Sequence, residues 1–235
     1  MSSDKTRMVP AEPLVVVIDG PSGTGKSSVS KAVARSLGIG YLDTGAMYRA
    51  LTWWCVNEGI ELDDQPAVAR ASQTFPLAMG TDPGAPTVSV GELDISEAIR
   101  APSVSGAVSR VATNLGVRAE LIRRQRELIG SISARTGGVV AEGRDLTTVV
   151  APDATVRLLM TASEEARIAR RAGELSSTVT ATRAQIVDRD ARDSTVAAFM
   201  TAADGVVTID TSSLDFEGSI AAVLGAIEVG RSSFP

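Results

Sequence analysis

The feature that most constrains the fold is a glycine-rich turn between a β-branched run and an amphipathic segment. The run LVVVID (14–19) ends at Gly20 and predicts a buried parallel strand. After the turn, Val29, Val33 and Leu37 recur every four residues, which predicts a helix with one apolar face. Backbone N–H groups of such a turn, at the N-terminus of a helix, bind anions. The sequence therefore predicts an α/β domain that holds phosphate at this turn.

The turn fits the pattern G-x-x-x-x-G-K-[ST] of a phosphate-binding loop. Its lysine, Lys26, is predicted to reach the β- and γ-phosphates, and the hydroxyl of Ser27 is predicted to bind Mg²⁺. Guanine-nucleotide switches recognise their base with an N-K-x-D motif, which the sequence lacks. The residues predicted to bind the nucleotide are Gly20, Pro21, Ser22, Gly23, Thr24, Gly25, Lys26, Ser27 and Ser28.

Beyond the loop, strand-like and helix-like segments alternate, which predicts an α/β fold with a central parallel sheet. The exception is 75–100, where short apolar pieces between Gly and Pro turns predict a small antiparallel insertion. The remaining strands are expected at 40–43, 137–143, 155–161 and 205–213. The helices are expected at 26–38, 44–59, 103–133, 163–175, 182–194 and 216–230.

Composition excludes several kinds of chemistry. The chain of 235 residues has no histidine, so histidine acid–base catalysis and histidine metal sites are ruled out. The single Cys55 cannot form an internal disulfide and suits a reducing cytoplasm. A net charge of −5 argues against a protein that coats nucleic acid, and the apolar stretches are too short to span a membrane. We therefore expect a cytoplasmic protein without nucleic-acid or membrane partners.

Two arginines follow predicted strands at the sheet edge where ligands bind in open α/β folds. Arg49 ends the segment DTGAMYR (43–49), in which Thr44 is a candidate N-cap of the next helix. Arg144 and Asp145 belong to EGRD, directly after the strand at 137–143. Each has a structural alternative: Arg49 could be a helix-surface side chain, and Arg144 could form a loop salt bridge with Asp145.

A third group of arginines is predicted to form a lid. Arg167, Arg170 and Arg171 have helical spacing that places them on one face of the helix at 163–175. Phosphoryl transfer needs positive charge around the transferred group and exclusion of water, and a closing lid supplies both. The alternative is a solvated, salt-bridged helix face.

Five segments, in this order, resemble bacterial cytidylate kinases, which phosphorylate CMP and dCMP with ATP. The resemblance runs from about residue 14 to about residue 215, and the second and fourth segments are much more specific than the first. The segments are GPSGTGKSS (20–28), LDTGAMYR (42–49), VRAELIRRQR (117–126), EGRDLTTVVAPDA (142–154) and RDARDS (189–194).

The resemblance implies a three-layer P-loop NTPase fold with a monophosphate-binding domain and a helical lid. The core is expected at 12–43, 112–165 and 194–230, the monophosphate-binding domain at 44–111, the lid at 166–193, and loose tails at 1–11 and 231–235. It also implies Mg²⁺ with ATP as the phosphoryl donor, and CMP or dCMP as the acceptor. We expect a monomer.

The resemblance also assigns site residues. Arg49 and Arg144 would hold the acceptor phosphate, with Thr44 close by. Three side chains would recognise cytosine: Ser109, Arg118 and Asp145. Asp193 and Arg189 would hold the ribose. The predicted catalytic residues are Lys26, Arg144, Arg167 and Arg171.

The chain departs from the family pattern at three positions. Val196 stands where the family usually has arginine, Thr147 replaces a usual glycine, and Ala151 replaces a usual phenylalanine. Two other functions remain open: a small P-loop kinase with a different acceptor, and a nucleotide-binding module without catalytic activity.

Overall fold

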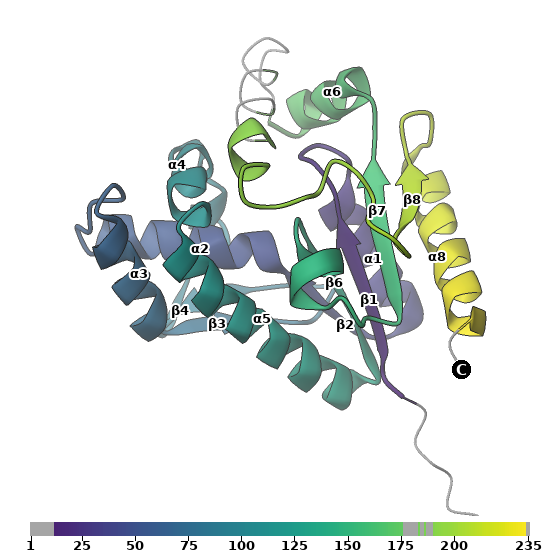
Figure 1. The fold of residues 1–235 in the computed structure, drawn as a ribbon, viewed down its shortest axis with the longest axis horizontal. Helices are drawn as coiled ribbons and strands as arrows, with labels where there is room; N and C mark the ends of the chain where they lie inside the picture. Colours follow the sequence, from purple (N-terminus) through teal and green to yellow (C-terminus); the bar gives the residue numbers. More distant parts are fainter. Residues whose placement is uncertain (1–11, 176–182, 184–185, 187–189, 234–235) are drawn as a thin grey trace, which may run out of the picture.

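A computed structural model describes residues 12–175, 183, 186 and 190–233 (Figure 1). Its centre is a five-stranded sheet in the order β2-β6-β1-β7-β8, and every neighbouring pair of strands is parallel. The predicted parallel sheet is therefore confirmed. The strands are β1 (Leu14–Asp19), β2 (Gly40–Asp43), β6 (Gly138–Gly143), β7 (Val156–Thr161) and β8 (Val207–Asp210).

Helices cover both faces of this sheet, which gives three layers. On one face α1 (Lys26–Leu37) and α8 (Phe216–Ser233) pack against each other and against the strands. On the other face lies the long α5 (Leu115–Thr136), together with α2 (Thr44–Asn57). Both faces of β1 are buried in separate apolar clusters, which explains its unbroken β-branched sequence.

The segment between β2 and α5 forms the left side of the molecule in Figure 1. It holds the predicted antiparallel insertion, a three-stranded sheet in the order β3-β4-β5. It also contains α3 (Gln65–Thr74), a helix that the sequence analysis did not predict. The strands are β3 (Leu77–Met79), β4 (Val88–Val90) and β5 (Leu93–Asp94), and a short 3-10 turn (Ala98–Arg100) follows.

The single helix expected at 103–133 was wrong. The structure has two helices, α4 (Pro102–Ala112) and α5, separated at Thr113 and Asn114. Asn114 has an extended backbone, and its side chain accepts hydrogen bonds from the first N–H groups of α5. An asparagine N-cap starts a new helix at this point, although apolar residues continue on both sides.

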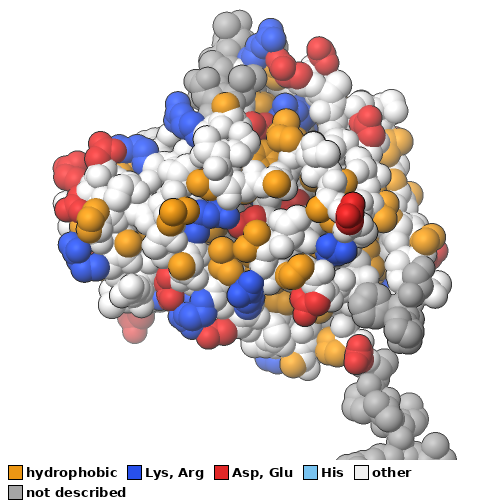
Figure 2. Space-filling view, viewed as in Figure 1, with side chains coloured by type: hydrophobic (Ala, Val, Ile, Leu, Met, Phe, Trp, Pro, Cys, Tyr) orange, Lys and Arg blue, Asp and Glu red, His pale blue; other side chains and the backbone are white. Residues whose placement is uncertain are grey.

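The segment predicted as the lid, 166–193, begins within α6 (Glu164–Leu175). Of the helix predicted at 182–194, the described residues Arg183, Ile186 and 190–193 are helical, and Ser194 lies in a turn. A π-helical turn (Leu146–Val150) after β6 was not predicted. Within the described ranges no helix combines the length and apolar character needed to cross a bilayer. The face in Figure 2 mixes basic and acidic side chains rather than presenting one continuous basic surface.

Candidate active site

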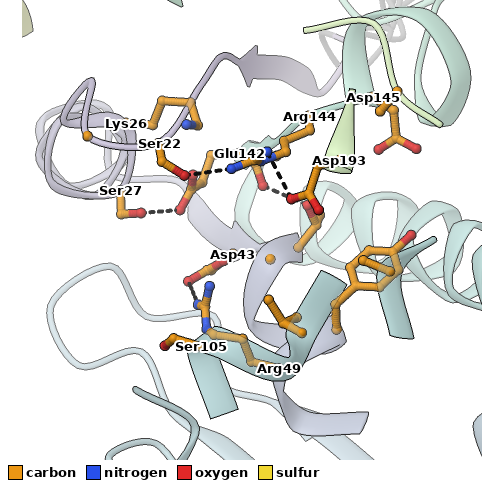
Figure 3. A pocket seen from close by; sticks show the side chains of 18 of the residues that line it. Ser22, Lys26, Ser27, Asp43, Arg49, Ser105, Glu142, Arg144, Asp145 and Asp193 are labelled. Carbon is orange, nitrogen blue, oxygen red and sulfur yellow. Dashed lines mark hydrogen bonds and ion pairs between the residues drawn. The ribbon is translucent and has the colours of Figure 1, made fainter. Parts of the chain in front are cut away.

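A cavity of about 580 Å³ opens at the carboxyl ends of β1, β2 and β6. Its wall includes the predicted phosphate loop, the start of α2, residues of α4 and α5, and the segment after β6 (Figure 3). Parallel strands of an open sheet commonly bind ligands at this edge. The fold therefore brings segments far apart in the sequence to one site.

The phosphate loop has the backbone that its glycines predict. Gly20 has a φ of 147°, and a Cβ there would lie 2.1 Å from the carbonyl oxygen of Met160 on β7. Gly25 is left-handed and immediately precedes α1. The Lys26 side chain curls back and donates to the Pro21 carbonyl at 2.8 Å. Burial lowers the pKa of Lys26 to about 8, partly offset by the nearby Glu142 carboxylate.

Ser27, the predicted metal ligand, lies against the buried carboxylate of Glu142. The Ser27 hydroxyl donates to Glu142 Oε1 at 2.5 Å, and the Tyr41 hydroxyl donates to the same oxygen at 3.1 Å. Burial raises the pKa of Glu142, and the neighbouring Asp43 acts in the same direction. A hydroxyl beside a carboxylate offers the oxygen ligands that Mg²⁺ prefers.

The sequence analysis did not assign Glu142 a role. The available signal was its position as the first residue of EGRD, at the end of a buried strand. In the described part of the chain, no group of three acidic or cysteine side chains forms a protein-only metal site.

Arg49 lies at the cavity wall, paired with Asp43 at 2.8 Å. Asp43 also accepts a hydrogen bond from the Ala46 N–H, so Asp43 rather than Thr44 caps α2. Burial raises the pKa of Asp43, but Arg49 and the capping bond outweigh it and leave the pKa below its usual value. The Thr44 hydroxyl donates to the Glu142 carbonyl at 2.8 Å, which links the start of α2 to β6.

Arg144 also lines the cavity, and several groups fix its guanidinium. Its Nη2 donates to the Ser22 hydroxyl at 2.6 Å and lies 2.9 Å from Asp190. Its Nη1 lies 2.8 Å from Asp193, and the Phe199 ring lies 4.4 Å from the guanidinium carbon. The ion-pair partners of Arg144 are thus Asp190 and Asp193. Within the described residues, the structural alternative, a salt bridge between Arg144 and Asp145, is not found.

The predicted cytosine-recognition residues do not all reach the cavity. Arg118 and Asp145 line it as an ion pair at 2.6 Å. Burial raises the pKa of Asp145, and Arg118 opposes this shift. Ser109 is buried, and its hydroxyl donates a hydrogen bond to Asp193 Oδ1 at 2.8 Å. It is not among the described residues that line the cavity.

The three arginines of α6 lie in three different environments. Arg171 lines the cavity. Arg167 is buried, donates to the Ser22 carbonyl at 2.9 Å and pairs with Asp190 at 2.5 Å. Arg170 donates to the carbonyls of Thr211 and Leu214, which ties α6 to the segment after β8. The spacing predicted a shared face but not this division, because the partners lie far away in the sequence.

Arg189 lies outside the described residues. Val196, the departure from the family pattern, lines the cavity. Lys31 and Arg100 also line it and add positive charge that the sequence analysis did not assign. Arg100 lies close enough to Asp43 to help lower the pKa of that carboxyl.

Comparisons with known proteins agree with this architecture. A curated cytidylate kinase of Streptomyces avermitilis is 45% identical over 235 residues, 99% of this chain and all of that protein. One of Streptomyces coelicolor is 46% identical over 226 residues, 95% of this chain and 96% of the relative. A gluconokinase crystal structure from Sinorhizobium meliloti has a TM-score of 0.51 at 14% identity, covering 94% and 95% of the two chains, which supports the fold alone.

The family model described as cytidylate kinase matches residues 16–229. The match spans the phosphate loop, the arginines that line the cavity and α6. The chain belongs to the cytidylate kinase family.

Proposed function

We propose that the protein transfers the γ-phosphate of ATP to CMP or dCMP, giving CDP or dCDP. The observation that carries this proposal is a single cavity lined by the phosphate loop, Arg49, Arg144 and the Arg118–Asp145 pair. The phosphate loop, as the proposed donor site, and Arg49 and Arg144, as the proposed acceptor site, line the same cavity. Membership of the cytidylate kinase family supports the same reaction.

In the proposed reaction an oxygen of the acceptor phosphate attacks the γ-phosphorus of ATP in line. The bond from that phosphorus to the β–γ bridging oxygen breaks, and ADP leaves. The acceptor phosphate is ionised near neutral pH, so the protein needs no general base. Its contribution is positioning and stabilisation of charge.

Lys26 would contact the β- and γ-phosphates, and Arg144 would hold the acceptor phosphate together with Arg49. Arg171 would add charge from the lid side of the cavity. For Arg49 this requires that its pairing with Asp43 leaves donors for the phosphate, and a guanidinium has five N–H groups. Bidentate pairing with phosphate is favourable for both arginines.

The residues present fit a magnesium ion, because the Ser27 hydroxyl touches a buried carboxylate beside the phosphate loop. Ser27 and Glu142 would hold the ion with oxygens of the nucleotide. When bound, the ion neutralises phosphate charge and orients the β- and γ-phosphates.

Cytosine recognition is assigned to Asp145 and Arg118. Cytosine offers an amino donor at N4, which suits the carboxylate, and acceptors at N3 and O2, which suit the guanidinium. Uracil carries a carbonyl in place of the amine, so a carboxylate at this point would disfavour UMP.

A coupled assay of ADP release with CMP, dCMP, UMP and AMP tests the proposal. We expect CMP and dCMP to be preferred, and Lys26→Ala to lose kcat with every acceptor. A preference for another acceptor would instead favour a different small P-loop kinase. ATP binding without transfer to any of the four would favour a non-catalytic module. Val196 is the reason to test this outcome, because it stands where the family usually has arginine.

A further inference from the structure

Asp190 is a buried carboxylate to which the proposed reaction gives no role. It lies in the helical segment 190–193 and is 6% exposed. It is not among the described residues that line the cavity, so it is not in position to contact a substrate there. A buried charge is retained at a cost unless several partners compensate it, so its partners indicate what it does.

The partners of Asp190 come from three different parts of the chain. Oδ1 accepts the backbone N–H of Ser22 in the phosphate loop at 3.2 Å, and Arg144 Nη2 lies 2.9 Å from the same oxygen. Oδ2 pairs with Arg167 Nη1 of α6 at 2.5 Å. One carboxylate therefore connects the phosphate loop, the segment after β6 and the lid helix.

The two arginines make their own contacts with the phosphate loop. Arg144 donates to the Ser22 hydroxyl at 2.6 Å, and Arg167 donates to the Ser22 carbonyl at 2.9 Å. Ser22, Arg144, Arg167 and Asp190 thus form a closed cluster with Asp190 at its centre. The Asp190 carboxylate lies between two guanidinium groups and reduces their mutual repulsion, and Asp193 also pairs with Arg144 at 2.8 Å.

We infer that Asp190 is a positioning residue, which sets the Arg144 guanidinium relative to the phosphate loop. This inference rests on the proposed function, in which Arg144 holds the acceptor phosphate. Small displacements of a positioning group lower the rate of a reaction that depends on in-line geometry. Asp190 would therefore act through Arg144, on kcat more than on nucleotide binding.

The variant Asp190→Asn keeps the size of the side chain and one acceptor oxygen but removes the charge. We expect kcat with CMP and with dCMP to fall at least about tenfold, while KM for ATP changes less than about threefold. Asp204→Asn, an exposed aspartate, is the matched control and is expected to behave as wild type. An Asp190→Asn enzyme with unchanged or increased kcat would overturn the inference.

A double-mutant cycle tests whether the effect passes through Arg144. We expect Asp190→Asn to lower kcat further by less than about twofold in an Arg144→Ala background, because the side chain it positions is already gone. Losses that multiply instead would show that Asp190 acts by another route and would overturn the inference.

These variants distinguish a failure of the positioning role from a failure of the proposed function. Wild-type protein that fails to phosphorylate CMP contradicts the proposed function, whatever the variants do. If circular dichroism shows that the Asp190→Asn variant is not folded, Asp190→Glu is measured in its place. Glu keeps the charge but moves the carboxylate outward by about one C–C bond, so kcat should still fall. A wild-type kcat in that variant would refute the positioning role.

Discussion

At the scale of single residues, the pair formed by Arg118 and Asp145 sets the expected base preference. Both side chains line the cavity, and Asp145 is 5% exposed. We expect Asp145→Ala to raise KM for CMP by roughly tenfold to a hundredfold, the range for a lost charge-assisted hydrogen bond. Activity with UMP should fall less. Steady-state kinetics with both acceptors measures the change in preference.

Asp145→Asn is the matched variant for this prediction. An amide of the same size can donate to the uracil carbonyl as well as accept from the cytosine amine. In the Asp145→Asn variant, the ratio of kcat/KM with CMP to kcat/KM with UMP should therefore be lower than in wild type, because the variant uses UMP better. Equal losses toward CMP and UMP in both variants would remove the basis for assigning Asp145 to the base.

Glu142 is predicted to take part in binding Mg²⁺. Its carboxylate touches the Ser27 hydroxyl, and Tyr41 supports the same oxygen. Glu142→Gln preserves the size but removes the charge that would attract a cation. We expect the Mg²⁺ concentration for half-maximal activity to rise roughly tenfold to a hundredfold, as for changed groups around metal sites. Titration of Mg²⁺ at fixed ATP measures it, and an unchanged requirement would count against this metal site.

At the scale of elements, the sequence predicted those strands and loops whose position depends on a local pattern of residues. The apolar runs of β1, β6 and β7 and the glycine-rich loop are local signals, and the structure has these elements where they were expected. The helix predicted at 103–133 was wrong because apolar residues continue through the break at Asn114. Only the cap residue marks the break, and asparagine also occurs in loops.

Long-range partners could not be predicted from local pattern. Arg167, Arg170 and Arg171 share a helix, but only the fold brings Arg170 to the carbonyls after β8 and Arg167 to the phosphate loop. In the same way, the hydrogen bond from Ser109 to Asp193, 84 residues further along the chain, has no local signal in the sequence. Periodicity gives the face of a helix, whereas tertiary packing decides what that face meets.

Asn114 is predicted to stabilise the start of α5. Its side chain accepts from the N–H groups of Gly116 and Val117, and its amide donates to the Gln65 carbonyl. Asn114→Ala removes these bonds, and we expect the free energy of unfolding to fall by about 1–2 kcal/mol, the range for a lost N-cap. Urea denaturation measures this loss. Ser131→Ala, an exposed site within α5, is the control and should leave stability nearly unchanged.

At the scale of the whole molecule, Asp19 connects the sheet to the active-site segment. It is the last residue of β1, fully buried, directly before the phosphate loop. Its carboxylate accepts the N–H groups of Leu146 and Thr147 and the Thr147 hydroxyl. Thr147, a departure from the family pattern, thus adds a hydrogen bond that a glycine would lack. The same turn follows Arg144 and Asp145 in the chain, so Asp19 helps to fix the segment that carries both.

Burial of Asp19 gives stability a pH dependence. Burial raises its pKa from 3.8 to about 6, despite the opposing hydrogen bonds from Thr147 and Leu146. Between these two values the folded protein binds the proton more tightly than the unfolded chain does. The contribution of Asp19 to stability is therefore complete below about pH 4 and declines as the pH rises toward and past 6. A shift of about two pKa units corresponds to roughly 3 kcal/mol as an upper estimate.

Because other groups titrate in the same range, the test compares wild type with Asp19→Asn. Free energies of unfolding are measured by urea denaturation at intervals from pH 4 to pH 7. The asparagine does not titrate, so the stability of wild type minus that of the variant should decrease steadily across this window. A difference that stays constant would mean that Asp19 keeps an ordinary pKa despite its burial beside the phosphate loop, and one that grows with pH would mean that its pKa is lowered; either result would contradict the prediction.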